Sequence, residues 1–430
     1  MTDQHLLYED MVLKKHIFPQ KLGEQQLLYL LNHSRNHVPI YKNLPMFKSY
    51  EEFSKSKYVL KKDVLKENIW QAVDMHYSKK DILGKNPFLN LIKLLTDFLI
   101  PISTSGSTGK PLHFFKNKRT GLIALFSWIE AVKYLGWDEG AKVMTCWQQG
   151  SYMKVGFPEF ISKIIGINFF LFKMINKRSC RKFIRKYKLI RPEILQGFPS
   201  YLTEFAIYIK ENKIKLNHTP KLIVTCGEVL TKNHKKLINS VFKTEIYDVY
   251  ANSEAGALAV ECKQHNGYHI LEDHILLENG PNYSILLTSL EQFDMPFIKY
   301  ELGDRGKIVY GKCVCGIVGH RIKKIEGRTE DYFYNRKGDK IFASFLRQLT
   351  LKANAKFGDI IQRTQFVQSD KYSIKCKVKL AENVKDAKVK KFIRFVKTKI
   401  KLSTKLDTNI SVVDELIQKK GKFKFLVREI

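Results

Sequence analysis

The sequence of 430 residues has no long uninterrupted apolar segment. Its two most apolar stretches, Phe88–Ile102 and Ile161–Ile175, are each interrupted by lysine or aspartate, and neither reaches the roughly 20 apolar residues that a membrane span needs. The first 20 residues mix acids, bases and histidine, which is unlike a secretory signal peptide. We therefore expect a cytoplasmic protein without a transmembrane segment, with weak contact to a membrane surface at most.

Acidic residues and arginine are both scarce. The formal net charge is +32, and the cations are 60 lysines but 14 arginines. Because bidentate phosphate contacts in nucleic-acid recognition favour arginine, this bias argues against a specific nucleic-acid partner. Residues 332–430 contain 20 Lys and 5 Arg against 9 acidic residues, a net charge of +16. Such a segment is either a solvated lysine-rich face or a field that attracts polyanionic ligands.

Cysteines are few and odd in number, seven in all, so a disulfide framework is not expected. Three of them belong to two short pairs, Cys262-Lys-Gln-His265 and Cys313-Val-Cys315. Two such pairs supply the four ligands of a tetrahedral structural zinc site. His269 and His274 are alternative ligands, and reduced thiols without a metal remain the simpler interpretation.

Apolar periodicity divides the chain in two. Residues 1–100 are mainly helical in pattern, and from about 98 to 330 strand-like runs such as Lys142–Trp147 and Lys221–Cys226 alternate with helical stretches. This alternation predicts an α/β core. Residues 332–430 predict a hairpin, two paired strands and a long helix over Val384–Leu402, which is typical of a small α+β domain. We expect domains at 1–330 and 331–430.

The strongest local signal is the segment Ser-Thr-Ser-Gly-Ser-Thr-Gly-Lys-Pro, residues 103–111. Its glycines allow a tight turn that presents backbone N–H groups, and its hydroxyls and lysine can contact phosphate oxygens. It is not a Walker loop, because the glycines are too close together and Pro111 stands where that loop has Ser or Thr. The predicted phosphate-binding residues are Ser103, Thr104, Ser105, Gly106, Ser107, Thr108, Gly109 and Lys110.

The segment resembles the nucleotide loop of the adenylate-forming superfamily, and within it the phenylacetate–CoA ligase branch with its CapK-type relatives. Further segments that resemble family motifs follow in order along the chain: Gly197–Tyr201, Gly227-Glu228, Tyr250-Ala-Asn-Ser-Glu254, Tyr300-Glu-Leu-Gly-Asp304, Gly327-Arg-Thr-Glu-Asp331 and Gly421-Lys422. The resemblance implies a large N-terminal multi-sheet α/β domain and a small C-terminal α+β lid domain. It also implies that the Cys/His pairs hold a metal.

Residue roles follow from the same resemblance. Nucleotide binding is implied for Gly227, Glu228, Tyr250, Ser253, Asp304 and Arg328, in addition to the phosphate loop. Glu254 would bind Mg²⁺, a hard cation that prefers oxygen ligands. Asp331 would be the hinge, and Lys422 the catalytic lysine that stabilises charge as pyrophosphate leaves.

The resemblance therefore implies an ATP-dependent ligase that converts a small carboxylic acid into an acyl adenylate and passes the acyl group to coenzyme A. One alternative keeps the adenylation and transfers the acyl group to a sugar or amine in capsular or surface polysaccharide biosynthesis. A second is a non-catalytic basic protein that binds polyanions. The order of the motifs favours the ligase, because net charge does not explain it.

Overall fold

A computed structural model describes most of the chain. The described residues are 23–82, 98–103, 112–138, 140–148, 167–172, 177–328, 332–342, 345–346, 349–350, 353, 356–357, 360–381, 384, 386–414, 416, 418–419, 422–423 and 425–429. They form two compact units. The first contains most of the chain up to Ile325, and the second contains Glu326–Ile430 together with Gly303–Arg305.

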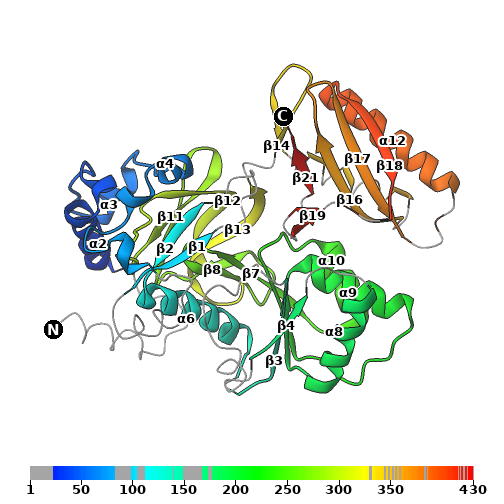
Figure 1. Ribbon diagram of the computed structural model, residues 1–430, viewed down its shortest axis with the longest axis horizontal. Helices are drawn as coiled ribbons and strands as arrows, with labels where there is room; N and C mark the ends of the chain where they lie inside the picture. Colours follow the sequence, from blue (N-terminus) through cyan, green and yellow to red (C-terminus); the bar gives the residue numbers. More distant parts are fainter. Residues whose placement is uncertain are drawn as a thin grey trace. The chain divides into compact units, whose positions relative to one another are not determined.

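A mixed sheet of eleven strands dominates the first unit (Figure 1). Its order is β10-β11-β12-β13-β9-β8-β7-β6-β5-β3-β4, and a separate pair is formed by β1 and β2. The strands of this unit are β1 Ile100–Ser103, β2 His113–Lys116, β3 Val143–Gln148, β4 Ile167–Phe172, β5 Ile194–Gly197, β6 Leu222–Cys226, β7 Ile246–Asn252, β8 Gly256–Glu261, β9 Tyr268–Ile270, β10 Ile275–Asn279, β11 Ser284–Ser289, β12 Tyr300–Lys312 and β13 Val318–Arg328.

Five neighbouring strands of this sheet, from β4 to β7, run parallel to one another. From β7 onward, β8, β9 and β13 pair antiparallel. The carboxyl ends of β3, β5, β6 and β7 therefore meet at one edge, which is where open α/β sheets bind ligands.

Helices cover the sheet and bury its apolar side chains. They are α2 Glu24–His37, η1 Pro39–Tyr41, α3 Tyr50–Lys55, α4 Lys62–Glu67, η2 Ile69–Ala72, η3 Lys79–Asp81, α6 Lys118–Leu135, α8 Lys177–Ile190, α9 Pro199–Glu211, α10 Lys232–Phe242 and η4 Pro281–Tyr283. The side chain of Asn117 caps the start of α6, and Gly136 ends that helix with a positive φ of 108°.

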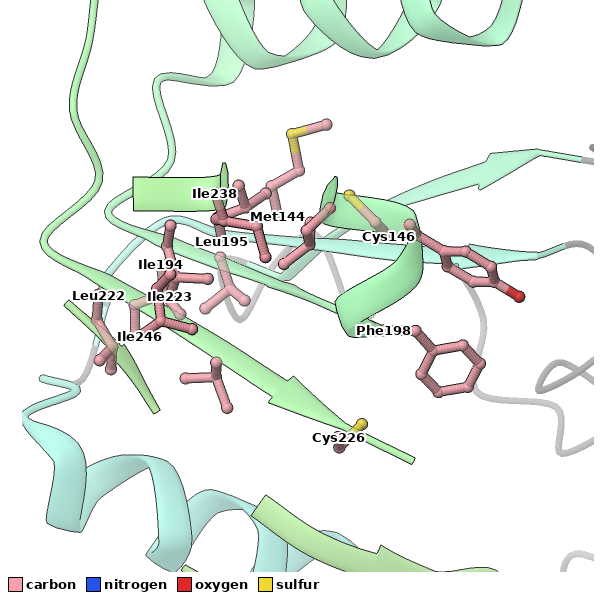
Figure 2. Close-up of a cluster of buried hydrophobic side chains, with 14 of the residues drawn as sticks. Met144, Cys146, Ile194, Leu195, Phe198, Leu222, Ile223, Cys226, Ile238 and Ile246 are labelled. Carbon is pink, nitrogen blue, oxygen red and sulfur yellow. The ribbon is translucent and has the colours of Figure 1, made fainter. Parts of the chain in front are cut away.

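Two apolar clusters hold the first unit together. One joins the parallel strands to α8, α9 and α10, and Figure 2 shows part of it, with Phe198 at the same end as Cys146 and Cys226. The other joins the N-terminal helices and the β1–β2 pair to the antiparallel strands. Each cluster removes many large side chains from water, which is the main stabilising contribution to such a fold.

The second unit has a four-stranded sheet of order β18-β17-β16-β21, with α12 against it (Figure 1). Its elements are β14 Tyr332–Tyr334, β15 Lys340–Phe342, β16 Ile361–Gln368, β17 Ser373–Leu380, α12 Asp386–Thr404, β18 Asp407–Val412, β19 Gln418–Lys419, β20 Lys422–Phe423 and β21 Leu426–Arg428. Its own apolar cluster contains buried residues such as Phe366, Phe392 and Ile400.

The predicted fold class, a large multi-sheet α/β unit and a small C-terminal α+β unit, is confirmed. The strands expected at Lys142–Trp147 and Lys221–Cys226 correspond to β3 and β6, and the helix expected at Val384–Leu402 corresponds to α12. None of the helices in the described ranges has the length and apolarity that crossing a bilayer requires.

Candidate active site

The predicted phosphate loop connects two paired strands. Strands β1 and β2 run antiparallel, and Ser103, the last residue of β1, lies opposite His113, the first residue of β2. The other predicted members of the loop, residues 104–110, lie outside the described residues. The structure thus places the strands on either side of the segment beside each other, and the phosphate contacts of the segment stay a prediction.

The predicted adenine-side pair Gly227-Glu228 follows β6 and contacts the start of α9. Both carboxylate oxygens of Glu228 accept hydrogen bonds from Ser200, one from its backbone N–H and one from its hydroxyl, each 3.0 Å long. This carboxylate therefore caps the N-terminus of α9, where partial positive charge favours an anion. The segments Gly197–Tyr201 and Gly227-Glu228, far apart in sequence, are joined in this way.

Aromatic side chains pack beside the same pair. Gly227 has a φ of +72°, and a Cβ atom there would lie 2.7 Å from Cε1 of Phe198. The Phe198 ring centroid is 4.5 Å from that of Trp147 and 5.0 Å from that of Tyr201. Glycine is needed at residue 227 for its conformation and for the space that Phe198 occupies.

The predicted adenine and magnesium residues lie at the end of β7. Tyr250 is buried within the strand, Ser253 is exposed in the turn that follows, and Glu254 is 6% exposed. The hydroxyl of Tyr300 donates a hydrogen bond to Oε1 of Glu254 over 3.4 Å. A buried carboxylate that accepts one such bond retains lone pairs for a cation or a further donor.

Lys116, on β2, adds a cation to this region. Burial lowers the pKa of its ammonium group to about 8, while the negative charges of Asp294 and Glu254 act in the opposite direction. Asp294 in turn accepts hydrogen bonds from the backbone of Asn117 and the hydroxyl of Thr120, at 2.8 and 2.5 Å. No sequence motif indicated this buried group of charges.

The remaining predicted residues all belong to the second unit, which includes Gly303–Arg305 as well as Glu326–Ile430. Asp304 lies on β12, half-buried, after Gly303 with its φ of +81°. Arg328 ends β13, Lys422 begins β20 opposite Lys419, and Asp331 lies outside the described residues. At Arg328 and Lys422 the backbone alone is described, so their roles remain predictions.

Four potential metal ligands converge near the β8–β9 hairpin. Cys262, His269, Cys313 and Cys315 each offer a ligand atom within 4.8 Å of those of the others. The two Sγ atoms of Cys262 and Cys313 are 3.7 Å apart, and Sγ of Cys315 is 3.2 Å from Nε2 of His269. Tetrahedral Zn–S bonds of about 2.3 Å place two sulfur ligands about 3.8 Å apart, so this set fits a zinc ion. Burial and the charge of Arg321 lower the pKa of His269, which favours the neutral imidazole that a metal requires.

His265, the expected fourth ligand, is not a member of this cluster and is replaced by His269. Its ring stacks on Tyr247 with centroids 5.0 Å apart, and its Nδ1 lies 2.9 Å from Glu261 and 3.1 Å from Lys235. The prediction relied on the local spacing Cys-x-x-His. In the structure, antiparallel pairing of β8 with β9 places His269 opposite Val260 and so brings it to Cys262.

A buried polar network lies between the metal-ligand cluster and β7. The carboxylate of Asp248 accepts hydrogen bonds from the hydroxyls of Thr225 and Tyr268, at 2.6 and 3.0 Å. Glu261 accepts the backbone N–H of Asp248 at 2.9 Å and pairs with Lys235 at 2.7 Å. Since Tyr268 precedes His269 and Glu261 precedes Cys262, the network connects the cluster to the strand that carries Tyr250.

No protein-family model matches the chain. Protein CapK of Staphylococcus aureus is 24% identical over 408 residues, which cover 89% of this chain and 85% of CapK. Phenylacetate–coenzyme A ligase of Thermus thermophilus is 27% identical over 156 residues, 33% of this chain and 35% of that enzyme. The structure of 2-hydroxyisobutyryl-CoA ligase in complex with R3-HIB-AMP superposes with a TM-score of 0.72 at 17% identity, covering 94% of this chain and 88% of that one.

The structural likeness extends over nearly the whole chain and establishes the fold. The sequence likeness to CapK covers 89% of the chain, and that to the phenylacetate ligase covers a third of it. The family resemblance drawn from the ordered motifs is confirmed. The chain is a homologue of CapK and of phenylacetate–coenzyme A ligase, and it has the fold of the adenylate-forming superfamily.

Proposed function

We propose that this protein is an AMP-forming acid–thiol ligase, which adenylates a carboxylic acid with ATP and then transfers the acyl group to coenzyme A. One observation carries the proposal. Gly227-Glu228 follows β6, and Tyr250–Glu254 comprises the end of the neighbouring parallel strand β7 and the turn after it, so both segments lie at one edge of the sheet. That edge is where nucleotides bind in open α/β folds.

The first half-reaction would start with ATP held by the phosphate loop, Tyr250 beside adenine, Asp304 on the ribose hydroxyls and Arg328 on the ribose or phosphate side. A carboxylate oxygen of the acid attacks the α-phosphorus, and the bond from that phosphorus to the pyrophosphate oxygen breaks. Lys422 would stabilise the negative charge that develops on both sides of this bond. Positioning and electrostatics supply most of the catalysis in such reactions.

Glu254 is the residue that would hold the Mg²⁺ of the nucleotide. Its carboxylate is buried next to Tyr300, and oxygen ligands suit this cation. The ion would neutralise phosphate charge.

In the second half-reaction the sulfur of coenzyme A would attack the acyl carbonyl, and AMP would leave with the electron pair of the broken C–O bond. The second unit would turn about Asp331 between the two steps, a role that the family resemblance implies for this residue. Residues 332–430 carry a net charge of +16, which suits an anionic carrier.

We also infer that Cys262, His269, Cys313 and Cys315 hold a structural zinc ion. These four side chains would occupy all four coordination positions of a tetrahedral ion, which is typical of structural rather than catalytic zinc. Three ligands are buried and Cys315 is half-buried. The ion would crosslink β8, β9 and the turn between β12 and β13.

A second candidate function has its own support. The likeness to CapK extends over 89% of the chain, and the family resemblance includes a role in capsular or surface polysaccharide biosynthesis. In that case the adenylation is retained and the acyl group passes to a sugar hydroxyl or an amine.

Pyrophosphate release distinguishes these two functions. The assay would use a panel of aryl, fatty, hydroxy and amino acids, each with and without coenzyme A. The ligase predicts release with at least one acid and acceleration by coenzyme A. Acceleration by a nucleotide sugar but not by coenzyme A would support the CapK-type function, and no release with any acid would contradict both.

A further inference from the structure

The side-chain amide of Asn252 makes a hydrogen bond through its oxygen but not through its nitrogen. Its Oδ1 accepts the backbone N–H of Ala255 over 2.8 Å, which closes the turn after β7. Its Nδ2 is buried and has no hydrogen-bond partner among the described residues. Since the oxygen must face the Ala255 N–H, the orientation of the amide is fixed and the NH₂ group points away from the turn.

A buried donor without a partner costs roughly 1–3 kcal/mol, so native structures retain few of them. Those that remain call for an explanation, and at an active site one explanation is a ligand that accepts the bond. Asn252 occupies such a place. It is the last residue of β7, two residues after Tyr250 and two before Glu254.

The surroundings of Asn252 are crowded by α6. Asn252 pairs with Gly256 of β8, and a Cβ atom on Gly256 would lie 2.7 Å from Oγ of Ser127 and 2.8 Å from Cα of Ala124. The hydroxyl of Ser127 also accepts the backbone N–H of Ala257 at 3.1 Å. The turn is therefore held firmly against the helix, and the amide can select a ligand by position as well as by chemistry.

We propose that Asn252 is a specificity-determining residue whose side-chain N–H donates a hydrogen bond to the acid substrate, at an acceptor oxygen other than the reacting carboxylate. The substrate class is then a carboxylic acid with a hydroxyl, ether or carbonyl oxygen on its chain or ring. This inference rests on the proposed function and deepens it. A site built to bond a polar group discriminates strongly against the analogue that lacks it, because the donor then stays unpaired.

The test compares acids of one carbon skeleton with and without the oxygen, such as lactate with propionate, 3-hydroxybutyrate with butyrate and 4-hydroxybenzoate with benzoate. ATP–pyrophosphate exchange gives kcat/KM for each acid. Asn252→Asp is the informative variant, because it keeps the acceptor for the Ala255 N–H and replaces the donor with a charged oxygen, a charge that the control variant also introduces. Asn279→Asp is the matched control, at the end of β10, where the amide bonds Gly306 and Ile308.

For the wild type we expect kcat/KM at least about 10-fold higher for the oxygenated acid of one pair. Asn252→Asp should reduce that ratio about 10-fold or more, with the KM for ATP little changed, and Asn279→Asp should leave the ratio intact. An unchanged ratio in Asn252→Asp would mean that water satisfies the amide, and it would contradict the inference. Equal losses for both acids of a pair would also contradict it, because the contact would then be to the shared carboxylate. Absence of exchange by the wild type with every acid would instead contradict the proposed function.

Discussion

Asp248 should make the stability of the first unit depend on pH in an unusual direction. Burial, together with the negative charge of Glu261, raises the pKa of its carboxyl to about 8, although hydrogen bonds from Thr225 and Tyr268 and the charge of Lys235 act in the opposite direction. In the unfolded chain the pKa of an aspartate is about 3.9. Between those two values the folded protein binds a proton at this residue that the unfolded chain does not.

Proton linkage determines whether the free energy of unfolding rises or falls with pH. A group whose folded pKa is raised stabilises the fold when protonated, so the free energy of unfolding falls as pH rises from about 4 to about 8. The slope of one such group is about 1.4 kcal/mol per pH unit, which is about 2–3 kcal/mol between pH 5 and pH 7. Asp248→Asn removes the titration and keeps a side chain of the same shape.

Urea unfolding followed by tryptophan fluorescence measures this effect, because all four tryptophans precede residue 150 and report on the first unit. Between pH 5 and pH 7 we expect the free energy of unfolding of the wild type to fall by about 2–3 kcal/mol relative to that of Asp248→Asn. Glu193→Gln is the control, since its hydrogen bond with Lys221 lowers the pKa of Glu193, the opposite direction to that of Asp248. A difference between wild type and Asp248→Asn that is the same at both pH values would refute the reasoning.

Three further predictions concern the site residues. Elemental analysis of the purified protein should find one zinc ion per chain. The zinc should be retained in His265→Ala and lost in His269→Ala. The opposite pattern would show that His265, as expected from local spacing, is the ligand. Gly227→Ala should lower the free energy of unfolding by about 2–4 kcal/mol in urea titration, because the positive φ is strained and the new Cβ overlaps Phe198. Glu228→Ala should cost about 1 kcal/mol through loss of the cap on α9, with Glu228→Gln costing less since it keeps an acceptor, and equal losses for both would count against capping.

Much of the fold could be predicted from local sequence. Strands β3 and β6 are apolar runs bounded by polar residues, and such runs are typical of parallel strands buried on both faces. The second unit was predicted in still more detail, because β16 and β17 alternate and α12 has clear helical spacing. These signals depend on neighbours along the chain.

The features that the sequence did not predict depend on strand register and on the folded surroundings. His269 joins Cys262 because β9 pairs with β8, and no spacing within either segment reports that pairing. Asp248 meets Glu261 across the β7–β8 pair in the same way. The buried donor of Asn252 could not be read from sequence either, since a hydrogen-bond partner is a property of the folded surroundings.

The central claim, adenylation with Lys422 as the catalytic cation, is tested most directly by ATP–pyrophosphate exchange in Lys422→Ala with the acid that the wild type uses best. Lys419→Ala, the residue opposite Lys422 in the β19–β20 pair, is the matched control for charge and fold. We expect exchange to fall about 100- to 1000-fold in Lys422→Ala, with the KM for ATP little changed, and to persist in Lys419→Ala. Exchange at the wild-type rate in a folded Lys422→Ala protein would contradict the assignment.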